Sequence, residues 1–102
     1  MVKLSSAHII IGSTLASSLL GNAQRVNWVY YPQRKTLMVA AAEDELFKQL
    51  HKTSGSLLKL KNALGDRGMA MRELLIDNDL DEQDRELEYK ADTTLNILNI
   101  YF

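Results

Sequence analysis

The chain has 102 residues, 46% of them hydrophobic, which predicts one folded domain spanning residues 1–102 and excludes general disorder. It contains no cysteine, which excludes a disulfide framework, a thiolate zinc site and a cysteine nucleophile. The net charge of −1 is unevenly distributed, because residues 1–42 carry four basic and no acidic side chains whereas residues 43–102 carry eight basic and thirteen acidic ones.

The segment 1–42 predicts a strand, a short helix and a β-hairpin. A histidine followed by three isoleucines is typical of a buried strand, and Gly12 ends it. Ser13 can cap a short leucine-containing helix, and Gly21 is a typical helix end. Pro32 lies in a turn between two segments rich in aromatic and β-branched residues, which favours a hairpin. The predicted segments are strand 8–11, helix 13–20, and strands 26–31 and 36–41.

The second half predicts a helix, a strand and another hairpin. Residues 43–45 are three carboxylates in what would be a first helical turn, where the helix dipole favours negative charge. Apolar residues follow at helical spacing, so we expect a helix over about residues 43–53. A strand is expected over 56–60, and a second hairpin over 87–102 is expected to turn near Asp92. The expected fold class is α+β and β-rich, with two β-hairpins and short helices.

The two ends of the chain align with each other without a gap when Leu4 is placed on Leu64. Leu15, Leu20 and Arg25 then fall on Leu75, Leu80 and Arg85. The shared order of strand, short segment and hairpin is stronger evidence than these four identities. It predicts two repeat units, 4–42 and 64–102, joined by a helical segment, 43–55, and interlocked because neither buries its apolar face alone. A chance match, with no duplication, is the alternative.

Residues 7–40, AHIIIGSTLASSLLGNAQRVNWVYYPQRKTLMVA, resemble the AbrB-type swapped-hairpin module of bacterial transcription regulators and antitoxins. Leu20-Gly21 matches the end of the family's short helix, and 26–39 matches its hairpin. A degenerate second copy would resemble the tandem arrangement of the MraZ branch. The resemblance implies an internally duplicated AbrB-like swapped-hairpin barrel. This chain departs from the family pattern at Gly12, where proline is usual, and at Ala23-Gln24, where Gly-Asp is usual.

The resemblance implies a small DNA-binding transcriptional regulator or antitoxin-like protein, whose partners would be double-stranded DNA and further copies of the chain. DNA-binding members carry basic residues around the first strand and short helix, where this chain has serines and a threonine. Phosphate contacts would fall instead to basic residues of both units, and replacing Arg34 and Lys35 by alanine would abolish duplex binding. The candidate nucleic-acid-binding residues are Arg25, Arg34, Lys35, Arg67 and Arg72, with Arg85 as a further basic residue of the second unit.

A protein-interaction or structural module that does not bind DNA is the alternative function. The two halves have complementary charge, so they could face each other within a monomer or an oligomer. Trp28, Tyr30 and Tyr31, near Arg25 and Arg34, could stack on single-stranded nucleic acid. We favour the simpler interpretation, in which one aromatic face joins the core and the other pairs across the hairpin.

Catalytic and metal-binding patterns are weak throughout. Residues 77–88 place carboxylates at the first, third, fifth and twelfth positions of a calcium loop, but Glu82 replaces the required glycine and Asp84 an apolar residue. We interpret the segment as an acidic solvated loop. His8 and His51 are not spaced as metal ligands, and the chain has no GxSxG motif. We therefore expect no enzyme, cofactor or metal site.

The apolar runs near the N-terminus are shorter than a signal peptide or a transmembrane helix requires. Together with the absence of cysteine, this favours a cytoplasmic protein with no membrane partner.

Overall fold

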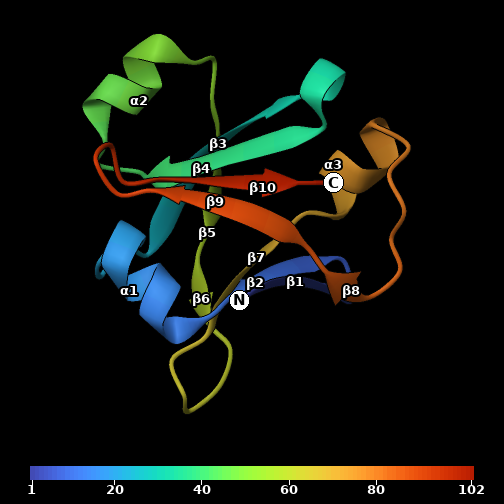
Figure 1. Cartoon of the computed structure of the whole chain (residues 1–102), viewed down its shortest axis with the longest axis horizontal. Coiled ribbons are helices and arrows are strands. Elements are labelled where there is room, and N and C mark those ends of the chain that lie inside the picture. The colour runs from blue at the N-terminus through green and yellow to red at the C-terminus, as the bar shows by residue number, and fades with distance from the viewer.

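Two five-stranded antiparallel sheets enclose one hydrophobic core (Figure 1). The structure, a computed structural model, describes residues 1–102, and it confirms the α+β, strand-rich fold class. The strands are β1 (Val2–Ser5), β2 (His8–Ile11), β3 (Arg25–Tyr31), β4 (Thr36–Ala41), β5 (Ser54–Leu57), β6 (Lys59–Leu60), β7 (Arg67–Ala70), β8 (Arg85–Glu86), β9 (Glu88–Asp92) and β10 (Ile97–Tyr101). The helices are α1 (Ser13–Leu20), α2 (Glu45–Leu50) and α3 (Arg72–Asp77), with a 3-10 turn, η1, at Pro32–Arg34.

Each sheet draws strands from both halves of the chain. One sheet has the order β6-β7-β2-β1-β8 and the other has the order β5-β3-β4-β10-β9. The halves meet at the pairs β2–β7, where Ile9 lies opposite Met69, and β4–β10, where Leu37 lies opposite Ile100. All four of these side chains are buried. Burial of apolar surface between the halves therefore stabilises both sheets at once.

At two positions the chain passes from one sheet to the other, and in each case a single buried leucine separates the two strands. Leu58 separates β5 from β6, and Leu87 separates β8 from β9. The Leu58 N–H donates to the Gln24 carbonyl oxygen, and the Leu87 N–H donates to the Val2 carbonyl oxygen, both at 2.9 Å. Each crossing thus keeps its backbone hydrogen bond while it adds an apolar side chain to the core.

The order β2–α1–β3–β4 recurs as β7–α3–β8/β9–β10. Both hairpin turns end in a left-handed residue, Lys35 (φ 46°) in the first and Asn96 (φ 56°) in the second. A residue with positive φ also follows each helix, but Gly21 (φ 57°, ψ −128°) comes directly after α1, whereas Asp79 (φ 54°) comes one residue after the end cap of α3, Asn78. The two halves therefore share element order and the conformation of the residue that ends each hairpin turn, and they differ at their helix ends.

The predicted helix 43–53 is shorter in the structure. The Asp44 carboxylate accepts a hydrogen bond from the Phe47 N–H at 3.0 Å and so caps α2, which therefore begins at Glu45. His51 adopts an extended conformation that ends the helix. Phe47 is buried against Ala40 and Ile97 on the outer face of the second sheet. None of the three α-helices combines the length and the apolar composition that a membrane crossing requires.

The other predicted elements are largely confirmed. Both hairpins, the strand 8–11 and the helix 13–20 are present, and the predicted strand 56–60 is divided into β5 and β6. Strands β1 and β7 and helix α3 were not predicted as separate elements. They are short, and their strongest support is pairing with distant parts of the chain.

Candidate nucleic-acid interface

A group of cations lies on β6 and beside β5 and β6, each of which is one of the two edge strands of its sheet. Lys59 and Lys61 are exposed on and just after β6. Arg67, half-buried, pairs with Leu60 in the neighbouring strand. Arg25 is exposed and pairs with Leu57, which lies two residues before Lys59 in the chain. We call Arg25, Lys59, Lys61 and Arg67 together the basic edge.

Two hollows flank Lys59 on the basic edge. One, of about 230 Å³, is bordered by Lys61 and His8. The other, of about 450 Å³, is bordered by Arg67 and by the exposed amides Asn22 and Gln24. The second hollow provides cationic and amide groups side by side, the two classes of side chain that contact phosphates and base edges.

Gly68 allows the Lys61 side chain to lie across β7. A Cβ atom at position 68 would collide with Lys61 Cε and with Ile10 Cδ1. The aliphatic part of Lys61 therefore covers Ile10, which is buried on the outer face of the sheet. Long basic side chains commonly bury their stems in this way while the ammonium group stays in water.

The loop between β6 and β7 is held by Asn62. Its Oδ1 atom accepts hydrogen bonds from the N–H groups of Leu64 and Asp66, and its amide nitrogen donates to the Asp66 carboxylate at 3.0 Å. The Asp66 carboxylate also accepts from the Ser13 N–H at 3.0 Å, at the start of α1. Asp66 is the single acidic residue between Lys52 and Arg72. Its hydrogen bond to the Ser13 N–H connects the loop to the start of α1.

Asn62 lowers the pKa of Asp66 through its hydrogen bond, and the Ser13 N–H and Lys3 lower it further. Because the pKa in the folded chain lies below the ordinary value, the stabilisation is present at neutral pH and is lost as the pH falls through the folded-state pKa. We expect Asn62→Ala to raise the pKa of Asp66, measured by NMR titration of its carboxyl carbon. Asn96→Ala, in an exposed turn, is the control and should leave that titration unchanged.

The cations of the basic edge have no carboxylate partner. The one ion pair of the chain joins Lys48 and Glu45, 4.0 Å apart on α2 and therefore within one half. No ion pair thus joins the two halves, although Lys3 of the first half lowers the pKa of Asp66 of the second. This observation argues against the interpretation in which complementary halves neutralise one another, and it leaves the cations open to an anionic partner.

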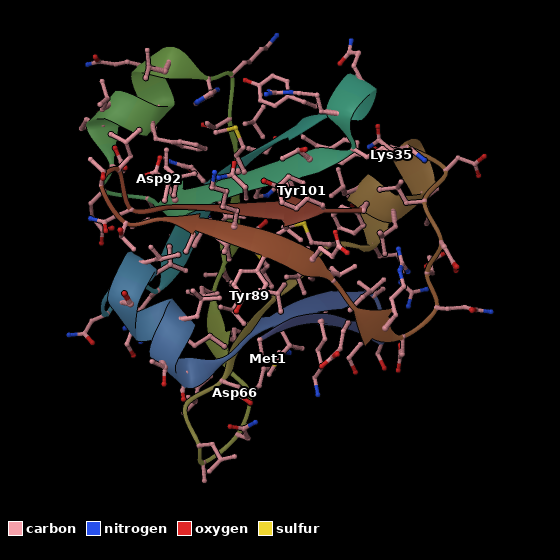
Figure 2. The ribbon with its side chains drawn as sticks, viewed as in Figure 1. Met1, Lys35, Asp66, Tyr89, Asp92 and Tyr101 are labelled. Carbon is pink, nitrogen blue, oxygen red and sulfur yellow. The ribbon has the colours of Figure 1, made fainter.

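The structure separates the predicted nucleic-acid-binding residues. Arg25 and Arg67 lie in the basic edge. Arg34 and Lys35 lie at the β3–β4 turn, where the Arg34 guanidinium carbon is 4.7 Å from the centre of the Tyr31 ring. Arg72 begins α3. Figure 2 shows Lys35 and the basic-edge loop at Asp66 on opposite sides of the molecule.

Arg85 and the aromatic residues are engaged within the fold. The Arg85 guanidinium donates to the carbonyl oxygens of Asp81 and Gln83 at 2.7 and 3.0 Å. Trp28 and Tyr30 pack against the core, as expected, and burial raises the pKa of the Tyr30 hydroxyl.

Lys59 and Lys61 were missed by the sequence analysis. The signal that could have found them is the alternation Lys59-Leu60-Lys61, which on a strand places both lysines on one face.

Within the acidic segment 77–88, residues 78–84 form a loop between α3 and β8. The Asp84 carboxylate accepts a hydrogen bond from the Ser6 N–H at 2.8 Å, and the Asp81 carboxylate accepts one from the Gln83 N–H at 2.9 Å. At no place in the chain do three or more His, Asp or Glu side chains come together as metal ligands. Of the histidines, His51 contacts Phe47 and hydrogen-bonds the Tyr31 hydroxyl.

Comparison with protein-family models, with curated proteins and with solved structures finds no match to this chain. The functional proposal therefore rests on the geometry and the charge of the basic edge.

Proposed function

We propose that this protein is a small DNA-binding regulator, transcriptional or antitoxin-like, that holds double-stranded DNA against its basic edge. The observation that carries the proposal is the group of four cations with no carboxylate partner along β5 and β6. Phosphate neutralisation with release of counterions is the main source of affinity for duplex DNA, and free cations on one edge supply it. No chemical step is involved.

In this proposal, the lysines contact the phosphates and so position the duplex, and the neighbouring amide side chains contact the base edges. Lys59 and Lys61 are exposed and carry their charge at the end of long side chains, so they can follow the phosphate backbone. Asn22 and Gln24 border the same hollow as Arg67, and amide side chains can pair with the edge of adenine in the major groove. The serines of α1, which cannot release counterions, need no role in this arrangement.

The proposal includes an internally duplicated swapped-hairpin fold. Its support is the repeated element order, together with the pairing of each corresponding strand with its counterpart, β2 with β7 and β4 with β10. The strands that precede the two crossing leucines also pair with strands of the other half: β5, before Leu58, pairs with β3, and β8, before Leu87, pairs with β1. One chain then supplies both copies of a module that would otherwise need two chains. The homo-oligomer expected from the resemblance stays a prediction.

Duplex binding tests the proposal by fluorescence anisotropy of a labelled mixed-sequence DNA at low and physiological salt. We expect the affinity to fall with salt at a log–log slope of about −3.6 if all four cations neutralise phosphates. Replacing Lys59 and Lys61 by alanine should weaken binding and make this slope shallower by about 1.8. The variant with Arg34 and Lys35 replaced is the matched control, because it removes the same charge elsewhere.

The same two variants separate the two possible surfaces. If the Arg34 and Lys35 replacements abolish binding and the Lys59 and Lys61 replacements do not, DNA lies on the β3–β4 turn, as the sequence predicted, and not on the basic edge. If the unaltered protein does not bind DNA even at low salt, the DNA-binding function is wrong.

A further inference from the structure

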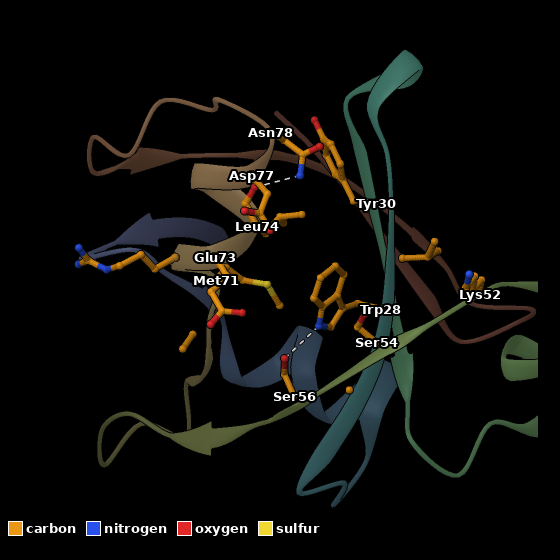
Figure 3. A pocket seen from close by; sticks show the side chains of 14 residues that line it. Trp28, Tyr30, Lys52, Ser54, Ser56, Met71, Glu73, Leu74, Asp77 and Asn78 are labelled. Atoms are coloured by element: carbon orange, nitrogen blue, oxygen red, sulfur yellow. Dashed lines mark hydrogen bonds between the residues drawn. The ribbon is translucent and has the colours of Figure 1, made fainter.

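A groove of about 830 Å³ opens between β5 and α3 (Figure 3), and it shares Ser56 and Ala70 with the smaller hollow beside Lys59 and Lys61. Strand β3 contributes Trp28 and Tyr30 to it, β5 contributes small side chains, and α3 with the residues beside it contributes Met71, Glu73 and Asp77. We call it the β5–α3 groove. Its volume lies within the range of natural ligand sites, and it is open along one side.

The groove exposes an unpaired strand edge. Strand β5 is the last strand of its sheet and is paired there with β3 alone. The Leu58 N–H bonds to the Gln24 carbonyl oxygen just before β3, and alternate residues of an antiparallel strand direct their backbone groups to opposite sides. Gly55 and Leu57 therefore direct their N–H and C=O groups away from β3. Because β7 ends at Ala70 and the chain turns into α3, no strand continues alongside β5 at Gly55.

The side chains around this edge form an aromatic wall and an acidic wall. The Trp28 indole N–H donates to Ser56 Oγ at 2.9 Å, which fixes the ring beside β5. Across the groove, Glu73 and Asp77 are exposed one turn apart on α3, and neither carboxylate forms an ion pair; the two cations of the lining are Arg72, next to Glu73 in the chain, and Lys52. Figure 3 shows the two carboxylates on the α3 side and Lys52 away from them, beyond the strands.

We propose that the β5–α3 groove binds an extended peptide segment carrying a lysine or an arginine, which adds to the sheet as a strand beside β5. The peptide backbone would pair with the free groups of Gly55, and its basic side chain would lie between the Trp28 ring and the carboxylates of Glu73 and Asp77. Strand addition supplies backbone hydrogen bonds at any free edge, and the charge and the aromatic ring select a cation. A nucleic acid is disfavoured here because its phosphates would face these two carboxylates.

Trp28 makes the binding directly measurable, because it is the only tryptophan of the chain. A phage-displayed library of random heptapeptides is selected on the full-length protein, and the enriched peptides are synthesised. We expect the enriched sequences to contain lysine or arginine and to lack aspartate and glutamate at the equivalent position. Each should shift the Trp28 fluorescence emission, and its titration gives the dissociation constant.

Two pairs of variants then test separately the charged contact with α3 and the backbone contact with β5. Glu73→Gln with Asp77→Asn should weaken the binding of the selected peptides at least about tenfold, since charge-assisted hydrogen bonds are lost. Asp79→Asn with Glu82→Gln removes the same charge from exposed positions that do not line the groove, and should change the affinity little.

Gly55→Pro removes the backbone donor at the free edge, where proline is tolerated, and should abolish binding. Gly55→Ala keeps that donor, and its Cβ would make only ordinary contacts, so it should still bind.

Three outcomes would overturn the proposal. The library could enrich no peptide, or only peptides without a basic residue. Gly55→Pro could bind as tightly as Gly55→Ala although both have the circular dichroism spectrum of the unaltered protein. Finally, the Trp28 emission could depend on protein concentration in step with dimer formation, in which case the occupant is a second copy of the chain. None of these results depends on whether DNA binds the basic edge.

Discussion

A fragment that ends at Thr53 is expected to be unfolded as a monomer, although it contains a complete predicted strand, helix and hairpin. In the fragment, β1 loses β8, β2 loses β7, β3 loses β5 and β4 loses β10. What remains is two separate two-stranded ribbons, and such ribbons are marginally stable at best in water. The apolar faces that bury Ile9 and Leu37 at the centre of the intact domain would be exposed to solvent.

Circular dichroism and the amide dispersion of a ¹H–¹⁵N spectrum measure this outcome for residues 1–53. At low micromolar concentration we expect no cooperative thermal transition. Addition of residues 54–102 is expected to restore the spectrum of the intact chain, because the missing strand partners return. Light scattering at high concentration tests the duplication, which predicts that two copies of the fragment pair in place of the two halves. A fragment 1–53 that melts cooperatively as a monomer would show that the halves are not interlocked.

Leu98→Ala is expected to reduce the free energy of unfolding by about 2–5 kcal/mol, the range for deleting a buried leucine side chain. Leu98 is fully buried, and it pairs with Val39 on one side and Ala91 on the other. It therefore lies where strands of the two halves meet, and the cavity would open between β4 and β9 rather than at a rim that can collapse. A loss of this size is a large part of the stability of a domain this small.

Urea denaturation followed by circular dichroism measures the change, and Leu95→Ala is the matched control. Leu95 lies slightly earlier in the chain, in the β9–β10 turn, and is 46% exposed, so its truncation should cost well under about 1 kcal/mol. Equal losses in the two variants would contradict the burial of Leu98 at the centre of the core.

The elements that the sequence predicted well have strong local signals. The hairpin of β3 and β4 combines aromatic and β-branched strands with a proline turn, and α2 combines acidic residues near its start with apolar residues at helical spacing. Local backbone preference and hydrophobic period act within one segment, so one segment is enough to reveal them.

The candidate site depended on information of another kind. Two of the five predicted cations, Arg25 and Arg67, belong to the basic edge, although they come from different halves of the chain and only Arg67 lines a hollow beside Lys59. Lys59 and Lys61 complete it because β5 and β6 pair with β3 and β7. A local pattern, the alternation Lys59-Leu60-Lys61, places the two lysines on one face, whereas only the pairing of Leu60 with Arg67 brings Arg67 to the hollow beside Lys59.

Composition and hydrophobic period by themselves determined that this is one β-rich α+β domain and where its hairpins turn. The tertiary structure alone decided that Leu58 and Leu87 pass strands from one sheet to the other, and that the lysines of the basic edge and the carboxylates of the β5–α3 groove lie at adjoining hollows that share Ser56 and Ala70. The physical reason is that strand pairing and burial bring together residues that are far apart in sequence, and these pairings also determine where the charged side chains lie on the surface.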